Sequence, residues 1–284
     1  MSAWLTLSFA VLFVSFGAVL VRLAAAPALA VSFYRVALAS LVLLPFAARD
    51  ARSSWPALAP RQRALLLAAG LALALHFATW IASLSYTSIA SSVLLVNTAP
   101  LFAIALSRVF LRERAPAVVL LATPIALAGA ALIAFGDWTG APGSLRGNLL
   151  AVAGAVTVAA YQVIGRGLRT ALPLNAYVLG VWSTAAVVLA ALAFACEVPL
   201  APFPARSWLV FLALALIPTI GGHGLVNKSL RSLPAPTVGL FLLGEPLGAS
   251  LLALLLFGEV PGPWTLAGGA VVLAALVLVA LRRD

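Results

Sequence analysis

Glu245 is the acidic side chain best placed for chemistry, because it lies inside a long apolar run from Pro234 to Pro261 and is followed at once by Pro246. An ionisable group within such a run is costly to bury, so it tends to face a cavity or a partner. A carboxylate there could bind a substrate ammonium group or carry a coupling proton. The structural alternative is a carboxyl group that hydrogen-bonds to the backbone freed by Pro246 or to a neighbouring helix.

Two stripes of polar and aromatic side chains recur at helical spacing within other apolar runs. The first stripe comprises His76, Thr79, Trp80, Ser83 and Thr87. The second stripe comprises Thr219, His223, Asn227 and Arg231. The two histidines are the only ones in the chain, and they could line a path, take protons near neutral pH, or hydrogen-bond between helices.

A substrate site is the functional interpretation of these stripes and of the polar and aromatic groups in the remaining runs. We expect it to contain His76, Trp80, Ser83, Asn97, Tyr161, His223, Asn227, Phe241 and Glu245. Arg35, about two turns inside the second run, could attract a carboxylate or tie helices together. Pro100, Pro234 and Pro246 are expected as hinges of bending helices, with static kinks as the alternative for Pro100 and Pro246.

Catalytic and metal-binding constellations are missing from the sequence. It has no nucleophile–base arrangement and no metal-type Cys/His spacing, and its single Cys196 excludes a disulfide framework. The 17 basic residues are spread over the ends of the apolar runs, so they do not form a single basic patch for binding nucleic acid. We therefore expect no catalytic residue, no metal and no cofactor, and we expect that the protein is not an enzyme.

Composition places the chain in a membrane, since 64% of its residues are hydrophobic and only 8% are charged. Apolar runs near 20 residues cross the hydrocarbon core as helices, because lipid offers no partner to unpaired backbone groups. The predicted fold is an all-α integral membrane protein with ten transmembrane helices. They span roughly residues 3–22, 28–48, 63–84, 89–110, 116–136, 146–166, 174–195, 207–229, 235–257 and 264–282.

The basic residues predict the orientation of these spans. With the N-terminus inside, 13 of the 17 basic residues fall at inner loops and ends, 3 fall outside, and Arg35 lies within a span. Both termini are therefore expected in the cytoplasm.

An internal repeat divides the chain. A shift of 146 positions brings Pro246 onto Pro100 and Glu259 onto Glu113, and it matches 8 of the 31 positions from 83 to 113. Two five-helix units, residues 1–140 and 141–284, would enter the membrane from opposite sides as inverted repeats, with the substrate site between them. The fifth and tenth spans are apolar all round and are expected at the periphery. Spans one, three, four, six, eight and nine would line the cavity.

Three segments carry a family resemblance: FYRVALASL around Arg35, PLFAIALSRVFLRE from Pro100, and EPLGASLLALLLFGE from Glu245 to Glu259. With them the chain resembles the drug/metabolite transporter superfamily in its ten-helix EamA-domain form, and it looks most like YddG-type exporters of aromatic and neutral amino acids. The resemblance implies a bacterial inner-membrane exporter that works by alternating access. Ala99 stands where the second half has Glu245, so a carboxylate role is expected in the second half only.

The function expected from the sequence is a secondary transporter that exports small amphiphilic metabolites, above all aromatic or neutral amino acids. The alternative is a membrane-embedded scaffold or enzyme subunit that handles lipid-linked substrates. Expected partners are the small-molecule substrate and the lipid bilayer, without nucleic acid. A homo-oligomer through the tenth helix and a monomer are equally consistent with the sequence.

Overall fold

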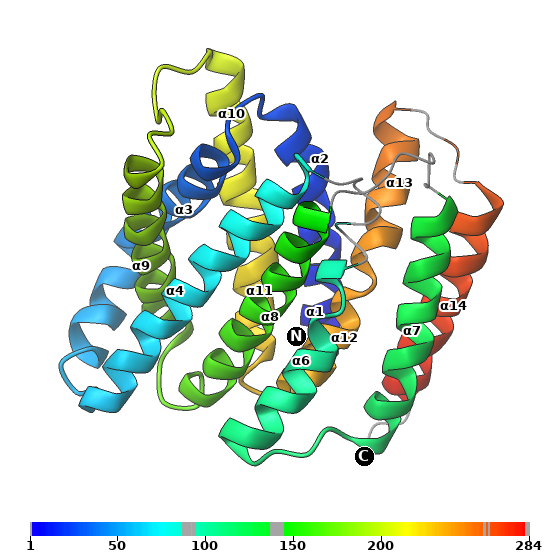
Figure 1. Ribbon diagram of the computed structural model, residues 1–284. Coiled ribbons are helices and arrows are strands. Elements are labelled where there is room, and N and C mark those ends of the chain that lie inside the picture. Colours follow the sequence, from blue (N-terminus) through cyan, green and yellow to red (C-terminus); the bar gives the residue numbers. More distant parts are fainter. Residues whose placement is uncertain are drawn as a thin grey trace.

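A computed structural model describes residues 2–86, 92, 95–136, 145–257, 260 and 262–281. These residues form helices joined by short connections, with no β-strand among them, as the composition predicts (Figure 1). Thr87, Glu259 and the expected boundary between residues 140 and 141 lie outside the described residues.

The helices up to residue 136 are α1 (Ala3–Val14), α2 (Phe16–Leu23), α3 (Ala28–Ser54), α4 (Pro60–Ser83), α6 (Ala99–Leu106), the π-helix η1 (Ser107–Leu111) and α7 (Ala117–Gly136). The helices from residue 145 are α8 (Leu145–Leu168), α9 (Leu174–Ala195), α10 (Ala205–Leu214), the π-helix η2 (Ala215–His223), α11 (Gly224–Ser229), α12 (Ala235–Leu242), α13 (Glu245–Phe257) and α14 (Pro263–Leu281). We call these two sets the first and second halves.

Proline marks where many of these helices begin. It lacks a backbone N–H, and the first turn of a helix has no internal partner for that group, so the start of a helix tolerates proline well. The residues at or directly before the helix starts include Pro27, Pro60, Pro173, Pro204, Pro234 and Pro263.

Among the described residues, six helical stretches are long and apolar enough to cross a membrane. They are Ala3–Leu23, Ala28–Ser54, Pro60–Ser83, Leu145–Leu168, Leu174–Ala195 and Ala205–Ser229. Three shorter apolar helices, Ala99–Leu111, Ala117–Leu132 and Leu266–Val279, fall in other expected spans. The total of ten membrane crossings therefore stays a prediction. Large apolar side chains such as Phe46, Val187 and Phe194 are mostly exposed on the outer surface, as expected where lipid surrounds the helices.

The run from Pro234 to Pro261 differs from the continuous helix expected over 235–257. The helix stops after Leu242 and restarts at Glu245, so that Leu243 and Gly244 form a turn between α12 and α13. Pro246 is therefore the second residue of a new helix, where its missing N–H does no harm. Glu245 occupies the first position of α13, and a carboxylate there interacts favourably with the helix dipole.

The two halves pack mainly against each other. Helix α4 packs against α8 and α9, α3 against α9, α6 against α8, and α1 against η2 and α11. The core of the molecule consequently lies between the halves, and a cavity at its centre receives residues from both.

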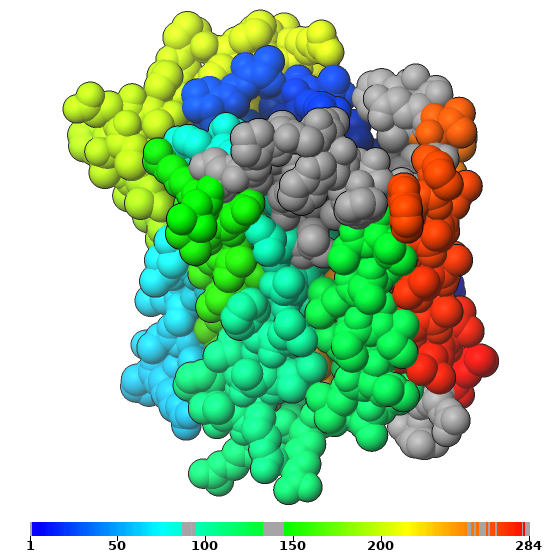
Figure 2. Space-filling view, turned by 45° about the vertical axis from the view of Figure 1, so that its right-hand side comes forward, coloured from blue at the N-terminus to red at the C-terminus, as the bar shows by residue number. Residues whose placement is uncertain are grey.

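Helices α7 and α14 form a separate pair at one edge of the molecule (Figures 1 and 2). They approach so closely at Gly129 that a Cβ atom there would lie 2.8 Å from the carbonyl oxygen of Gly268 and 2.9 Å from the backbone nitrogen of Val272. Their other faces expose leucines such as Leu121 and Leu266. The fifth and tenth apolar runs thus lie side by side, away from the centre of the bundle.

Candidate functional site

A cavity of about 70 Å³ lies at the centre of the bundle. Its wall draws on both halves, and none of the lining residues that the structure describes belongs to α7 or α14. Four titratable side chains, two amides and an indole line it together with apolar groups. The lining residues are Val14, Gly17, Arg35, His76, Trp80, Val96, Asn97, Ala99, Pro100, Val158, Gln162, Pro218, His223, Val226, Gly239, Leu242 and Glu245.

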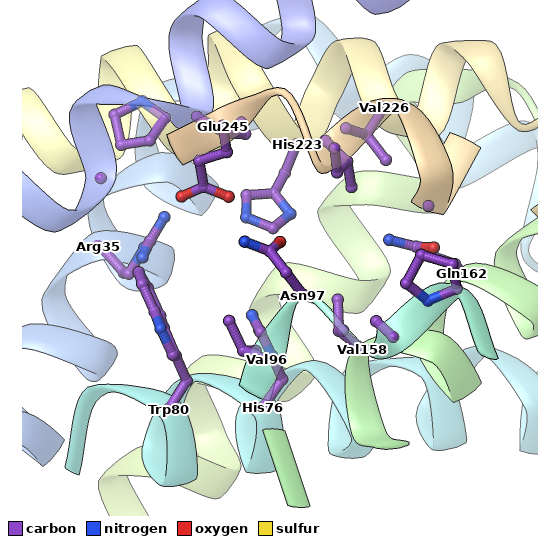
Figure 3. Close-up of a pocket in the computed structure, with 17 residues that line it drawn as sticks. Arg35, His76, Trp80, Val96, Asn97, Val158, Gln162, His223, Val226 and Glu245 are labelled. Carbon is purple, nitrogen blue, oxygen red and sulfur yellow. The ribbon is translucent and has the colours of Figure 1, made fainter. Parts of the chain in front are cut away.

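Charge is concentrated at one end of this cavity. Arg35 and Glu245 lie on the left of Figure 3, while Val158, Gln162 and Val226 lie on the right (Figure 3). We call these two regions the charged end and the neutral end. The cavity is therefore amphipathic along its length.

Glu245 reaches the cavity because α13 begins at this residue. Its backbone carbonyl accepts a hydrogen bond of 3.2 Å from the hydroxyl of Ser15, which lies in the break between α1 and α2. This contact joins the start of α13 to the first half. The side chain is half-buried and faces the cavity, so it can meet a ligand.

Arg35 is held on two sides. Its Nε donates a 3.2 Å hydrogen bond to the hydroxyl of Thr219, and its guanidinium carbon lies 4.0 Å from the centre of the Phe77 ring. Thr219 in turn donates a 2.8 Å bond to the carbonyl of Leu214 within the wide turns of η2. Sequence spacing alone leaves the role of Arg35 open, and the structure places it at the cavity wall.

The two histidines line the same cavity. Nδ1 of His76 lies 2.9 Å from the carbonyl oxygen of Gly154, and a carbonyl only accepts, so Nδ1 carries the hydrogen and Nε2 is the acceptor of the neutral ring. The ring stacks on Trp80 at 5.9 Å with an interplanar angle of 4°. His223 meets the edge of Phe77 at 5.3 Å.

Five of the nine expected site residues line the cavity: His76, Trp80, Asn97, His223 and Glu245. The other four are buried close by, without lining it: Ser83, Tyr161, Asn227 and Phe241.

Three of these four residues hold the surrounding structure together through polar or aromatic contacts. Asn227 donates one amide hydrogen bond to the Tyr161 hydroxyl and a second, of 2.7 Å, to the carbonyl of His223. Phe241 packs on Trp4 with ring centres 5.2 Å apart.

Ser83 is the fourth of these residues and lies at the C-terminal end of α4. Its hydroxyl donates a 2.6 Å bond to the carbonyl of Trp80, and it lies 2.6 Å from the hydroxyl of Ser92. It joins that end of the helix to the following segment.

The expected hinge prolines all lie at the starts of helices. Pro100 is the second residue of α6 and lines the cavity, while Pro246 is the second residue of α13. Pro234 caps the start of α12. Each stands at the beginning of a helix, so none of the three breaks a helix in its middle.

Gln162 and Arg35 line the cavity and are absent from the expected set. Gln162 directly follows Tyr161, but of these two neighbours only Gln162 lines the cavity. Val158, one turn earlier on the same helix, lines it as well. Asn97 and Gln162 are buried, and each has one amide atom without a hydrogen-bond partner among the described residues, Nδ2 and Oε1 respectively. Residue types alone do not predict this burial.

A second polar cluster, which we call the lower clamp, joins the two halves at the far end of α8. Nε of Arg166 donates to both carboxylate oxygens of Glu113, at 3.1 and 3.4 Å. Its Nη1 donates to the carbonyls of Leu230 and Arg231, at 3.2 and 3.0 Å. Glu113 of the first half thus forms an ion pair with Arg166 of the second half.

The described part of the chain contains no cluster of three or more His, Cys, Asp or Glu side chains that could hold a metal ion.

Comparison with known proteins gives matches over nearly the whole chain. A model of the EamA-like transporter family matches residues 1–135 and 145–281. An uncharacterized transporter, YwfM, of Bacillus subtilis (strain 168) is 27% identical over 216 residues, which cover 76% of this chain and 72% of the relative. An uncharacterized transporter of Archaeoglobus fulgidus is 29% identical over 270 residues, 93% of this chain and 91% of the relative.

A solved crystal structure has the same fold. It superposes with a TM-score of 0.82 over 99% of this chain and 96% of the other, at 20% sequence identity. At that identity the likeness concerns the fold.

Proposed function

Since this chain belongs to the EamA-like transporter family, we propose that it is a secondary transporter that exports small amphiphilic metabolites, above all neutral amino acids, across the bacterial inner membrane. In the part of the chain that the structure describes, six helices are long and apolar enough to span a membrane, which supports a multi-pass membrane protein. Two relatives carry the names of transporters. These findings favour transport over a scaffold or an enzyme subunit for lipid-linked substrates.

The observation that carries the substrate class is the amphipathic cavity. Glu245 at the charged end offers a carboxylate to a substrate ammonium group, and such charge-assisted hydrogen bonds are among the strongest in proteins. Val158 and Val226 at the neutral end offer apolar contact to a side chain. A small molecule with an ammonium group at one end and an uncharged side chain at the other fits this polarity.

Alternating access is the mechanism that we propose. Sites for small molecules usually enclose about 300 Å³ or more, and this cavity encloses about 70 Å³, so the helices must move apart to admit an amino acid. Both halves line the cavity, and movement of one half against the other would open it to either side. Inverted five-helix repeats over residues 1–140 and 141–284, with ten crossings and Pro100, Pro234 and Pro246 as hinges, belong to this proposal.

A solute gradient, of the substrate or of protons, is the proposed driving force. The sequence contains no phosphate-binding loop for a nucleotide. In a proton-coupled cycle, Glu245 would carry the proton.

Counterflow in proteoliposomes tests this function. Vesicles loaded with an unlabelled solute are assayed for uptake of labelled neutral amino acids and, for comparison, labelled nucleotide sugars. We expect uptake of neutral amino acids. If no member of the panel moves, the transport proposal is wrong.

The Glu245→Gln variant tests the carboxylate. We expect amino-acid counterflow to fall by about tenfold or more, because a charge-assisted bond to the ammonium group is lost. Counterflow is measured between about pH 5 and 8, where coupling groups titrate. Glu197→Gln is the matched control, because Glu197 is exposed in the connection after α9. Full activity of Glu245→Gln with an unchanged pH profile would remove Glu245 from both roles.

A further inference from the structure

Three nitrogen donors of the cavity wall have no hydrogen-bond partner among the described residues: Nη1 of Arg35, Nε1 of Trp80 and Nδ2 of Asn97. Their residues are only 1%, 6% and 7% exposed, and all three line the cavity. Figure 3 shows the three side chains ending toward the same region as Glu245. Buried donors are normally paired, so three unpaired donors around one space indicate that an acceptor from outside the chain completes the site.

We infer that Arg35, Trp80 and Asn97 form a subsite for the α-carboxylate of the substrate, at the same end of the cavity as the ammonium partner Glu245. This inference rests on the proposed function. It adds the α-carboxylate to the ammonium group as the second part of an amino acid that the site recognises. A carboxylate has two oxygens and about four lone-pair positions, so it can accept from all three donors at once. The side chains of Arg35 and Trp80 are donors only, and Asn97 adds the N–H of its amide.

A carboxylate is favoured over a neutral acceptor by the charge of Arg35. Its guanidinium is buried against Phe77 and Thr219, and within the described residues no carboxylate lies at ion-pair distance from it. A buried charge without a counter-ion is costly, and an anionic ligand removes that cost. A doubly charged anion such as phosphate fits less well, because Glu245 shares the cavity and would repel the added negative charge.

The subsite is built before the ligand arrives. Thr219 fixes Nε of Arg35, Phe77 lies against the guanidinium plane, and His76 stacks on the ring of Trp80. Side chains held in this way lose little freedom when a ligand binds, and such preorganisation increases affinity. The transporter should therefore distinguish an amino acid from the same molecule without its carboxylate charge.

The test is competition in proteoliposomes that contain the purified full chain. Counterflow of labelled leucine and labelled phenylalanine is measured against the unlabelled amino acid and against its amide, leucinamide or phenylalaninamide. Each amide keeps the ammonium group and the side chain and has a neutral carboxamide in place of the carboxylate. For the unaltered protein we expect the amino acid to compete about tenfold or more better than the amide, as a charge-assisted bond to Arg35 implies.

Three variants connect this preference to the subsite. Arg35→Gln should bring the ratio of acid to amide close to one. Trp80→Phe keeps an aromatic ring at this position and removes the N–H together with part of the indole, a change in size that the control below shares. It should lower the ratio about threefold or more. Trp182→Phe is the matched control, because Trp182 is also buried with an unpartnered Nε1 and does not line the cavity. The control should leave the ratio unchanged.

The outcomes separate this inference from the proposed function. Counterflow of amino acids with equal competition by acid and amide would overturn the carboxylate subsite and leave transport intact. An unchanged ratio in Trp80→Phe, or an equal loss in Trp182→Phe, would also overturn it, even if Arg35→Gln fails to fold. Absence of counterflow for every amino acid would overturn the proposed function and this inference together.

Discussion

The lower clamp allows one stability prediction to be worked out in detail. Arg166 joins Glu113 of the first half to the carbonyls of Leu230 and Arg231 in the second. The side chains of Arg166 and Glu113 are 19% and 33% exposed, so water weakens the ion pair without removing it. We compare Glu113→Gln, which removes only the ion pair, with Arg166→Gln, which also removes the bonds to both carbonyls.

The two variants should differ in their free energies of unfolding. A partly exposed ion pair contributes about 1 kcal/mol or less, so Glu113→Gln should cost about that much. A hydrogen bond from a charged donor contributes about 1.5 kcal/mol at the lower end, and the carbonyls can regain some water. Arg166→Gln should therefore cost about 3 kcal/mol in total.

Unfolding by titration with SDS in mixed micelles, followed by tryptophan fluorescence, measures both values. Arg114→Gln is the matched control, because Arg114 is exposed at the same end of the molecule and should change stability by no more than about 0.5 kcal/mol. The cost of Glu113→Gln should also shrink at high salt, since a partly exposed pair is screened. If Arg166→Gln costs no more than Glu113→Gln, the carbonyl bonds contribute nothing and this reasoning is wrong.

Two further predictions concern packing. Gly129→Ala should destabilise the protein by about 1–3 kcal/mol in the same titration, because its Cβ would meet the backbone of α14. Ala128→Leu, on the exposed face of α7, is the control and should have little effect. In neither variant should the ratio of acid to amide competition in counterflow change. Tyr161→Phe should cost about 1 kcal/mol, because the amide of Asn227 loses one acceptor, and equal stability of Tyr161→Phe and the unaltered protein would contradict the observed bond.

The sequence predicts the helical class and most helix positions because a long apolar run has few ways to satisfy its backbone in lipid. The family resemblance is confirmed as well, while the YddG-like specificity stays a prediction. The break before Glu245 could not be derived in the same way, since Leu243 and Gly244 are as apolar as their neighbours. Pro246 indicates an interruption of the helix at this point, but proline is typical both of a kink within a helix and of the start of a new helix.

The face of a helix is harder to predict than its position. Tyr161 and Gln162 are neighbours, and one step along a helix turns the side chain by about 100°. Residue type favours Tyr161 as a site residue, whereas Gln162 is the one that lines the cavity. The wide turns of η2 change the rotation of His223 relative to the residues before Ala215, and residue types do not reveal such turns. The pairing of Arg35 with Thr219 depends on how distant segments meet.

The interlocking of the two halves has a consequence for how the protein is made. His76 is bonded to the carbonyl of Gly154, which follows it by 78 residues, and Arg35 to Thr219, which follows by 184. At a synthesis rate of about 5–20 residues per second, the ribosome adds Gly154 roughly 4 to 16 s after His76, and Thr219 roughly 9 to 37 s after Arg35. During that interval the polar side chains of the first helices have no native partner within the bilayer. The newly made first half is therefore the stage of biogenesis at which an insertion factor or a quality-control protease would find these groups unpaired.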